Sequence, residues 1–493
     1  MNLLGALQLL LNPYVLLALI AGEVLGLFIG AMPGLTATMG AALIVPFTYF
    51  MDPLAGIAMI VGLSTVAIFA GDIPAVLLRI PGTPASAAQT LDAYQLSRKH
   101  PLSTLVIDLV CSSMGGIIGA LLLMFLSSLL AEFASNFSTV EYFWLALWGL
   151  SMAIVIAAES PIKGTIAVAL GFLISSVGID PVYGYPRFTL HRTELLNGIS
   201  FIPVMIGLFA IPELIKQISA SSKSFTINTL SETGVFNFVL KQVRKFKRVF
   251  ITSALIGTFI GALPGAGADI AAWVAYGVGK RTSKNPEMYG KGAVEGVIAS
   301  TSANNAAISG SWIPLLVFGI PGDSITAIAL GTLLTHGLRP GPTLFEKYGT
   351  LTTGIFLAFI FANLMMLLVG YVGIRLSTNI LKVPRNILVP IIATFSVVGA
   401  YAVNNSIFDV WIMFIFGIIG YFMERARIPL SSVVLAIILG PMVEFNFITT
   451  LIKANNDPLI FISRPIALGL AILTLVTWTL PILMSKLKGG RGV

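Results

Sequence analysis

The stretch GLFIGAMPG, residues 26–34, returns almost unchanged as GTFIGALPG, residues 257–265, in the same chain. The two copies agree at seven of nine positions, and each ends an apolar segment with a Pro-Gly pair. Proline removes a backbone donor and disfavours helix before it, while glycine permits a positive φ. We therefore predict two apolar helices that break at equivalent positions in two related halves of the chain.

Further matches extend this internal repeat. The first match has an offset of 231 residues, and two further motifs recur at an offset of 240 residues. Ile73-Pro74 recurs as Ile313-Pro314, and Ile80-Pro81-Gly82 recurs as Ile320-Pro321-Gly322. A weaker set at an offset of 268 residues pairs Glu141, Gly149 and Pro161 with Asp409, Gly417 and Pro429. Three matches in the same order divide the chain into a first repeat, 1–218, a linker, 219–248, and a second repeat, 249–493.

Composition places the chain in the lipid bilayer. Of 493 residues, 56% are hydrophobic and 10% are charged, with a mean hydropathy of +0.94, whereas soluble domains carry about 25% charged residues. Apolar runs of roughly 20 residues recur, each long enough to cross the hydrocarbon. We predict an all-α integral membrane protein with about 10–12 transmembrane helices in two homologous, inverted repeats with Pro-Gly-broken or re-entrant segments. The expected spans are 13–31, 54–70, 103–130, 138–159, 162–178, 199–217, 249–264, 350–373, 385–402, 407–423, 429–444 and 466–485. Shorter apolar stretches near 35–48, 266–279 and 324–338 are predicted half-helices or re-entrant segments.

The positive charge of the chain indicates topology. The net charge of +8 comes from Lys and Arg in gaps between apolar runs, without the basic stripe and interleaved aromatics of a nucleic-acid site. The linker ends in a basic cluster formed by Lys241, Arg244, Lys245, Lys247 and Arg248. Positive loops mark the cytoplasmic side, so we predict a cytoplasmic linker and no nucleic-acid partner; the alternative is a charged helix face without topological meaning.

Metal-binding and redox residues are scarce. Cys111 lies in an apolar run, and His100, His191 and His336 are far apart in the sequence. These numbers argue against a disulfide framework and against cysteine or histidine sites for zinc or haem, and we expect no cofactor. The N-terminal segment lacks a basic start and a small-residue cleavage site, so we expect it to be retained as a membrane segment.

Paired helix breaks favour a transporter. Backbone groups freed by a break are costly in hydrocarbon unless protein or a water-filled cavity satisfies them. Equivalent breaks in two repeats are typical of secondary transporters, whose site lies at the repeat interface near the bilayer midplane. Helix N-termini attract anions, so the residues after the breaks are the predicted substrate-binding set: Gly34, Leu35, Thr36, Thr38, Gly82, Thr83, Gly265, Ala266, Gly267, Gly322, Asp323 and Ser324.

Side-chain oxygens near the breaks suit a hard cation such as Na⁺. The candidate Na⁺ ligands are Ser64, Thr65, Asn304, Asn305 and Asp269. For any single hydroxyl the alternative is a bond to a carbonyl of its own helix or to a neighbouring helix. For the adjacent asparagines in SANNAA, helix packing is an equal alternative.

Other ionisable residues have two interpretations. Glu23 and Asp108 lie inside predicted spans, where an ionisable group is a functional candidate, although either could bond a neighbouring helix. Three carboxylates at predicted segment ends, Glu141, Asp409 and Glu444, are expected to anchor topology. Three residues after span 162–178, Tyr183, Tyr185 and Arg187, are interpreted as interfacial belt residues in preference to a gate.

A series of motifs resembles one known family. They are GAMPG (30–34) with its copy, IPGTP (80–84), LDAY (91–94), DPVYGYPRFT (180–189), SANNA (302–306), GIPGD (319–323), GLRPGP (337–342), AYAVNNSIFD (400–409) and LGPMVE (439–444). Over about residues 10–480 the chain resembles the TctA family, the large membrane subunit of tripartite tricarboxylate transporters. The resemblance implies a carboxylate substrate, a periplasmic solute-binding protein, a small membrane subunit of about four helices, a bacterial inner-membrane location and coupling to an ion gradient, in particular Na⁺.

The chain departs from the family pattern at two places. Phe69-Ala70-Gly71-Asp72 stands where the family shows a Tyr-Gly-Gly-Ser type sequence, and Arg79 directly precedes Ile80-Pro81. Asp72 either binds a cation or pairs with Arg79, and Arg79 either faces the substrate carboxylate or snorkels to an interface. Ser302 replaces an acidic residue before the asparagine pair, so one cation ligand is missing or replaced.

Two other function classes compete with a carrier. An intramembrane enzyme would need a nucleophile with a base, yet no Gly-x-Ser-Gly motif occurs and His336 is the only membrane-adjacent histidine. We expect no enzyme, and no ATP-driven pump either, because a Walker loop is missing. A passive anion channel would need a through-pore, whereas paired broken helices fit alternating access better.

Overall fold

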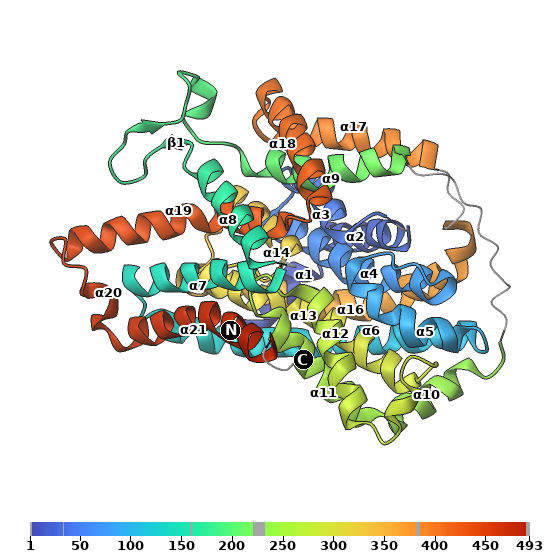
Figure 1. Ribbon diagram of the computed structural model, residues 1–493. Helices are drawn as coiled ribbons and strands as arrows, with labels where there is room; N and C mark the ends of the chain where they lie inside the picture. Colours follow the sequence, from blue (N-terminus) through green and yellow to red (C-terminus); the bar gives the residue numbers. More distant parts are fainter. Residues whose placement is uncertain (1, 33, 158–159, 220–231, 381–384, 490–493) are drawn as a thin grey trace.

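The fold is a bundle of helices (Figure 1). The computed structural model describes residues 2–32, 34–157, 160–219, 232–380 and 385–489. Within these ranges the strands form a single two-stranded antiparallel hairpin, β1 (Gly178–Ile179) and β2 (Pro186–Arg187). The α-helices are α1 Leu3–Leu10, α2 Pro13–Ala31, α3 Ala37–Thr48, α4 Pro53–Leu78, α5 Gln89–Ser97, α6 Pro101–Ala134, α7 Thr139–Ala157, α8 Pro161–Ser175, α9 Phe201–Ser219, α10 Val235–Lys245, α11 Lys247–Gly261, α12 Gly267–Thr282, α13 Val294–Phe318, α14 Ser324–Thr335, α15 Pro342–Lys347, α16 Gly349–Ile380, α17 Arg385–Asn404, α18 Ile407–Arg425, α19 Leu430–Lys453, α20 Ile460–Ser463 and α21 Pro465–Gly489. Short 3₁₀ turns are η1 Pro84–Ala88, η2 Thr193–Leu195 and η3 Pro286–Met288.

Every predicted span coincides with a helix, so the all-α membrane fold is confirmed. Among the described residues, seven helices are long and apolar enough to cross a membrane: α2, α4, α6, α9, α16, α18 and α19. Two boundaries differ most from expectation. Helix α4 continues to Leu78, past the expected end at 70, and α19 continues to Lys453, past 444. Helix α4 ends just before the Pro81-Gly82 pair, whereas in α19 Glu444, expected at a segment end, lies inside the helix.

Helices end and begin around the Pro-Gly pairs. Helix α11 ends at Gly261 and α12 begins at Gly267, while α13 ends at Phe318 and α14 begins at Ser324. In the first half, α2 ends at Ala31 and α3 begins at Ala37, and α4 is followed by η1. The three short apolar stretches predicted as half-helices thus form α3, α12 and α14. By contrast, the equivalent prolines Pro74 and Pro314 are accommodated inside helices.

The repeat is visible in how the helices pack. A Cβ atom on Gly26 of α2 would lie 2.4 Å from the Leu63 carbonyl oxygen of α4. A Cβ on Gly257 of α11 would lie 2.3 Å from the Ala303 carbonyl oxygen of α13. These positions correspond through the offsets of 231 and 240 residues. Both halves therefore use the same close helix crossing; their inverted relation in the membrane stays a prediction.

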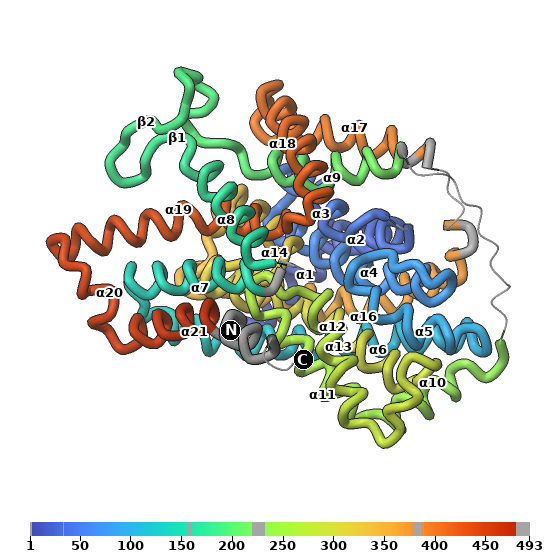
Figure 2. The backbone as a smooth tube through the Cα atoms, viewed as in Figure 1, coloured from blue at the N-terminus to red at the C-terminus, as the bar shows by residue number. Residues whose placement is uncertain are grey.

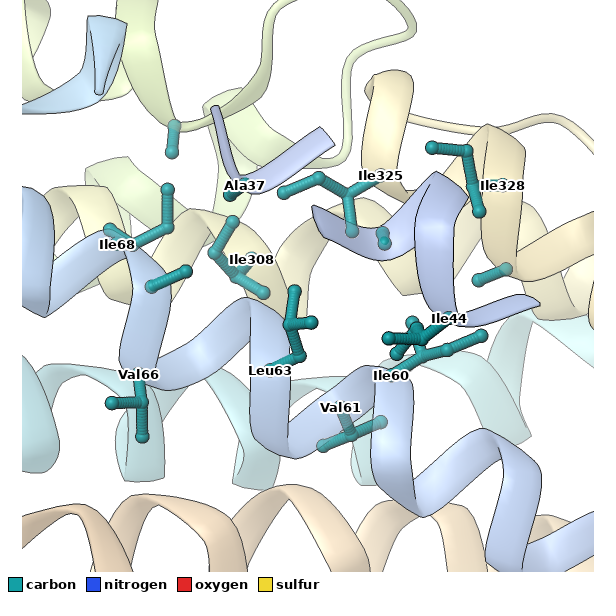
Figure 3. Packing of buried hydrophobic residues seen from close by; sticks show 14 of the residues in the cluster. Ala37, Ile44, Ile60, Val61, Leu63, Val66, Ile68, Ile308, Ile325 and Ile328 are labelled. Atoms are coloured by element: carbon teal, nitrogen blue, oxygen red, sulfur yellow. The ribbon is translucent and has the colours of Figure 1, made fainter. Parts of the chain in front are cut away.

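The two halves interlock. Helix α6 packs along α13, and α16 packs along both α6 and α4. The buried apolar core lies where these helices meet, and Figure 3 shows Leu63 and Ile68 of α4 near Ile308 of α13. Elements far apart in the chain thus form one core, against which the broken segments are held.

The linker contains an additional helix. Residues 220–231 of the predicted linker 219–248 lie outside the described residues, whereas 235–245 form α10, which packs on α6. Glu232 caps α6, because its carboxylate accepts the N–H groups of Leu102 at 3.0 Å and Ser103 at 3.2 Å. In Figure 2, α10 lies at one edge of the molecule and the β1–β2 hairpin at the opposite edge. The cytoplasmic location of the linker stays a prediction.

Candidate functional site

The broken segments of both halves surround one cavity. Its volume is about 440 Å³, and it is lined at the starts of α3, α12 and α14 and at the start of η1. The first-turn N–H groups of an α-helix have no acceptor within the helix and carry a partial positive charge. Three α-helices that begin at one cavity therefore form an environment suited to an anion.

Most of the predicted substrate residues line this cavity, although they come from distant parts of the chain. The predicted residues that line it are Thr36, Thr38, Thr83, Gly265, Ala266, Gly267, Asp323 and Ser324. The others, Gly34, Leu35, Gly82, Gly322 and Arg79, are absent from the described lining. The structure thus brings together the residues that follow each break. Most of the predicted residues in the Pro-Gly pairs themselves do not line the cavity.

The break glycines shape the wall by their own hydrogen bonds. The Gly265 N–H donates to the Gly322 carbonyl at 2.8 Å, and the Gly82 N–H donates to the Gly71 carbonyl at 3.0 Å. A Cβ on Gly82 would lie 2.4 Å from the Gly30 carbonyl oxygen, and a Cβ on Gly322 would lie 2.6 Å from the equivalent Gly261 oxygen. These N–H groups are therefore occupied, and donors for an anion come from the following residues.

The same capping arrangement begins η1 and α14. Asp323 Oδ1 accepts the Thr326 N–H at 2.7 Å, and the Asp323 N–H donates to Thr326 Oγ1 at 2.9 Å. In the first half the Thr83 N–H donates to Ser86 Oγ at 3.1 Å, at positions 240 residues earlier. The side chain of Asp323 thus caps a helix as well as facing the cavity.

The cavity contains both signs of charge. Two acidic residues, Asp269 of α12 and Asp323 before α14, both line it. Glu424, in the last turn of α18, and Arg427, between α18 and α19, also line it. Glu424 is positioned by Lys216, whose Nζ lies 2.7 Å from its carboxylate. The exposed Arg427 supplies a cationic side chain to the cavity.

The contribution of the α18–α19 turn was missed by the sequence analysis. Arg427 and residues 428–431 line the cavity, and Arg427 has a left-handed backbone with φ of 54°. The available signal was the third repeat match, which places Pro429 opposite Pro161 in the other half. It was too weak to show that this turn reaches a site formed by segments some 100 to 400 residues away.

The predicted Na⁺ ligands fall in different places. Asp269 lines the cavity. Asn304 and Asn305 are buried in α13, and the equivalent positions of α4, 240 residues earlier, hold Ser64 and Thr65. The Ser64 and Thr65 hydroxyls donate to the Val61 carbonyl, at 3.0 and 2.6 Å, which is the bonding to their own helix considered as the alternative. Their oxygens retain lone pairs for a cation.

The asparagine pair joins three other helices. Asn304 Nδ2 donates to Asp72 Oδ2 of α4 at 3.2 Å. Asn305 Nδ2 donates to the Ser112 carbonyl of α6 at 3.3 Å and to Asn363 Oδ1 of α16 at 3.1 Å. The carbonyl oxygens of both amides are buried and accept no hydrogen bond from the described residues. The pair therefore holds helices together and keeps two oxygens available.

Asp72 and Arg79 have separate surroundings. Asp72 is fully buried, whereas Arg79 is exposed at the end of α4, with its guanidinium 5.8 Å from the centre of the Tyr94 ring. Arg79 adopts a left-handed conformation with φ of 60°, and the equivalent position 240 residues later is Gly319 with φ of 74°. Arg79 thus ends a helix outside the cavity.

The residues after α8 form a fixed hairpin. Arg187 forms a salt bridge with Glu444 of α19 and another, at 3.1 Å, with Asp180. The pKa of the Asp180 carboxyl is below its ordinary value because the N–H groups of Tyr183 and Val182 donate to it. Tyr183 itself is exposed. These contacts give Arg187 a structural role.

Comparisons with known proteins agree with the residue pattern. The family model described as the tripartite tricarboxylate transporter TctA family matches residues 16–435. An uncharacterised 52.8 kDa protein of the TAR-I ttuC′ 3′ region of Agrobacterium vitis is 31% identical over 486 residues, which cover 97% of this chain and 95% of that protein. An uncharacterised protein of the TAR-II ttuC′ 3′ region of the same organism is 36% identical over 233 residues, or 47% of this chain and 96% of that protein. No solved structure matches the chain.

Proposed function

This chain belongs to the tripartite tricarboxylate transporter TctA family, and we propose that it imports a carboxylate delivered by a periplasmic solute-binding protein and couples import to a Na⁺ gradient. Family membership makes it the large subunit of a tripartite transporter and a multi-pass membrane protein, rather than an enzyme. We further propose that the transporter lies in the bacterial inner membrane, that it includes a small subunit of about four helices, and that Na⁺ is its coupling ion.

One observation carries the substrate assignment. The cavity of about 440 Å³ lies at the N-termini of α3, α12 and α14, within the range of about 300–1,000 Å³ that is common for small-molecule sites. A carboxylate there accepts first-turn N–H groups and the hydroxyls of Thr36, Thr83 and Ser324. Arg427 adds a positive charge on the side of the α18–α19 turn.

The acidic residues of the cavity support coupling to a cation. Asp269 and Asp323 line the same space as the proposed anion, and like charges in one cavity repel each other. A cation bound with the substrate offsets this repulsion. Carboxylate, hydroxyl and amide oxygens, which are available at Asp269 and on α4 and α13, are the ligands that hard cations prefer.

Replacement of Arg427 tests the cavity. Proteoliposomes containing the chain, its small subunit and its binding protein are supplied with radiolabelled citrate or succinate. Arg427→Gln is expected to raise the substrate concentration for half-maximal uptake about tenfold or more, because a charged hydrogen bond contributes about 1.5–3 kcal/mol. Arg425→Gln is the matched control, since Arg425 lies two residues away and outside the described cavity lining. Equal effects of the two substitutions would assign the substrate to another place.

Sodium coupling is tested in the same vesicles. An inward Na⁺ gradient is expected to drive accumulation above the external concentration, and a Na⁺ ionophore should abolish it. Asn304→Ala and Asn305→Ala are expected to shift the Na⁺ concentration required for half-maximal uptake, because they remove amide oxygens from α13. Uptake that stops at equal concentrations on both sides indicates a passive channel. A Na⁺ dependence unchanged in both variants would assign the asparagines to helix packing alone.

A further inference from the structure

Two carboxyl groups face each other in the interior, away from the cavity. Asp72 of α4 and Asp108 of α6 are both 0% exposed, and their carboxyl groups lie within hydrogen-bonding reach of each other. Neither residue belongs to the described lining of the cavity. The equivalent of Asp72 in the second half is Trp312, which cannot ionise, so this pair has no counterpart there.

The pair has few hydrogen-bond donors. Asp72 Oδ2 accepts from Asn304 Nδ2 at 3.2 Å. Asp72 Oδ1 and both carboxyl oxygens of Asp108 accept no hydrogen bond from the described residues. In the part of the chain that the structure describes, no Lys, Arg or His forms an ion pair with either residue. Two ionised carboxylates with so few donors and no counter-charge would be strongly unfavourable at such burial.

The surrounding groups do not relieve this charge. On α6, the Cys111 thiol lies near Asp108. The α13 residues that contact the pair are neutral: Asn304 donates to the Asp72 carboxyl, and the Thr301 hydroxyl donates to the Asp108 backbone carbonyl at 3.3 Å. Asn305, next on α13, donates to Asn363 of α16. On other helices packed on α4, the acidic groups are Glu23 of α2, beside Gly62, and Asp92 of α5. The Asp92 carboxylate is occupied by the Tyr276 hydroxyl at 2.8 Å and by three backbone N–H groups of residues 290–293.

We propose that Asp72 and Asp108 form one proton-binding site, in which a single proton is shared between the two carboxyl groups. The shared proton supplies the missing donor and reduces the charge of the pair from two to one. Two neighbouring carboxyl groups titrate as a unit because the first ionised group opposes ionisation of the second. This site goes beyond the proposed Na⁺ coupling, since it adds a second ion to the carrier.

The geometry favours a proton over a metal cation. A Na⁺ ion would need several oxygens directed at one point. Here the side-chain group of Asn304 that faces Asp72 is its N–H donor, which repels a cation. A proton needs only the two carboxyl oxygens and no empty volume, which agrees with the complete burial of both residues.

Infrared spectroscopy of the full chain in lipid, without substrate, tests the site. The wild-type protein at neutral pH is expected to show C=O absorption from one protonated carboxylic acid of this pair, which is lost in the double variant Asp72→Asn/Asp108→Asn. Because the proton is shared, each single substitution should shift this one component, since the remaining carboxyl then holds the proton alone. Glu23→Gln is the matched control, since Glu23 is another buried carboxyl without a described partner and should contribute a separate component.

Three results would overturn the proposal. They are a component that stays unshifted in a single variant or survives in the double variant, two separate wild-type components that are each lost with one residue, and loss of the wild-type component on addition of Na⁺ at constant pH, which would indicate a metal site. Size-exclusion chromatography reports folding of the variants. Should the double variant fail to fold, the single variants still decide, because a proton held by one residue alone would leave the component unshifted when the other residue is replaced. None of these measurements requires transport, so failure of the carboxylate assignment is detected separately.

Discussion

Gly265 illustrates how a single residue determines the shape of the cavity. Its backbone has φ of +81°, its N–H binds the Gly322 carbonyl at 2.8 Å, and a Cβ atom would lie 3.1 Å from Cα of Ala153 in α7. The left-handed region costs roughly 1–2 kcal/mol for a residue with a side chain. Glycine is thus required here by its backbone conformation and by the close approach of α7. Because the Gly265 N–H is occupied, the N–H groups available to a ligand belong to the residues after it.

Gly265→Val is expected to abolish carboxylate binding or to weaken it at least tenfold. A β-branched residue opposes the positive φ and displaces α7, so the start of α12 moves relative to α14. Gly277→Val is the control, because a Cβ at Gly277, within α12, meets no atom within 4 Å. Binding of radiolabelled citrate and elution as a single species in detergent are measured together. A monodisperse Gly265→Val variant with wild-type affinity would contradict the role of this break.

At the scale of elements, the two halves end equivalent helices with different residues. Helices α4 and α13 both end in a left-handed residue, Arg79 with φ of 60° and Gly319 with φ of 74°. The residue after each, Ile80 and Ile320, donates to the equivalent carbonyls of Pro74 and Pro314, at 3.3 and 3.2 Å. The cap geometry is therefore kept although one half lacks the glycine that this geometry favours.

Arg79→Gly is expected to raise the stability of the protein, by about 1 kcal/mol, because it relieves a left-handed conformation of a residue with a side chain. The converse change, Gly319→Arg, should lower stability by a similar amount. The midpoint of heat-induced unfolding in detergent measures both. Citrate uptake by Arg79→Gly is measured in parallel: since Arg79 lies outside the described cavity lining, uptake should persist. Loss of uptake in a stabilised Arg79→Gly variant would indicate that Arg79 contributes to the substrate site.

For the whole molecule, the relation of the two halves is the main question that the repeat raises. The α2–α4 and α11–α13 pairs use equivalent close contacts, at Gly30 with the Ala67 oxygen and at Gly261 with the Ala307 oxygen, each 2.2 Å from the position of a Cβ. Thr36 and Gly267 line one cavity, so the two repeats meet at their breaks. Inverted repeats around a shared site provide two similar conformations, open to opposite sides, for alternating access.

The inverted arrangement predicts that α2 and α11 begin on opposite sides of the membrane. Asn12→Cys and Lys247→Cys, each in a Cys111→Ser background, place single thiols at the exposed starts of these helices. A membrane-impermeant maleimide applied to right-side-out and inside-out vesicles should label each from only one side, and from different sides. Cys111→Ser without an added cysteine is the control. Labelling of both thiols from the same side would mean that the repeats have the same orientation.

Composition, segment length and the Pro-Gly pairs determined the helices of this protein without tertiary information. Long apolar runs form helices because each helix satisfies its own backbone hydrogen bonds. The breaks follow because Pro and Gly alter the backbone locally. The residues after the breaks were recognisable for the same reason, since a helix N-terminus attracts anions through its own backbone.

The assembly of these parts was decided only by tertiary structure. The approach of the α18–α19 turn, which brings Arg427 to the cavity, and the pairing of Asp72 with Asp108 depend on how α4, α6 and α13 pack. The helical length of α4 beyond residue 70 likewise depends on its surroundings, because a buried Asp72 requires partners from other helices. A local sequence pattern does not show which distant side chain a given residue will contact, because that contact results from the close packing of whole helices.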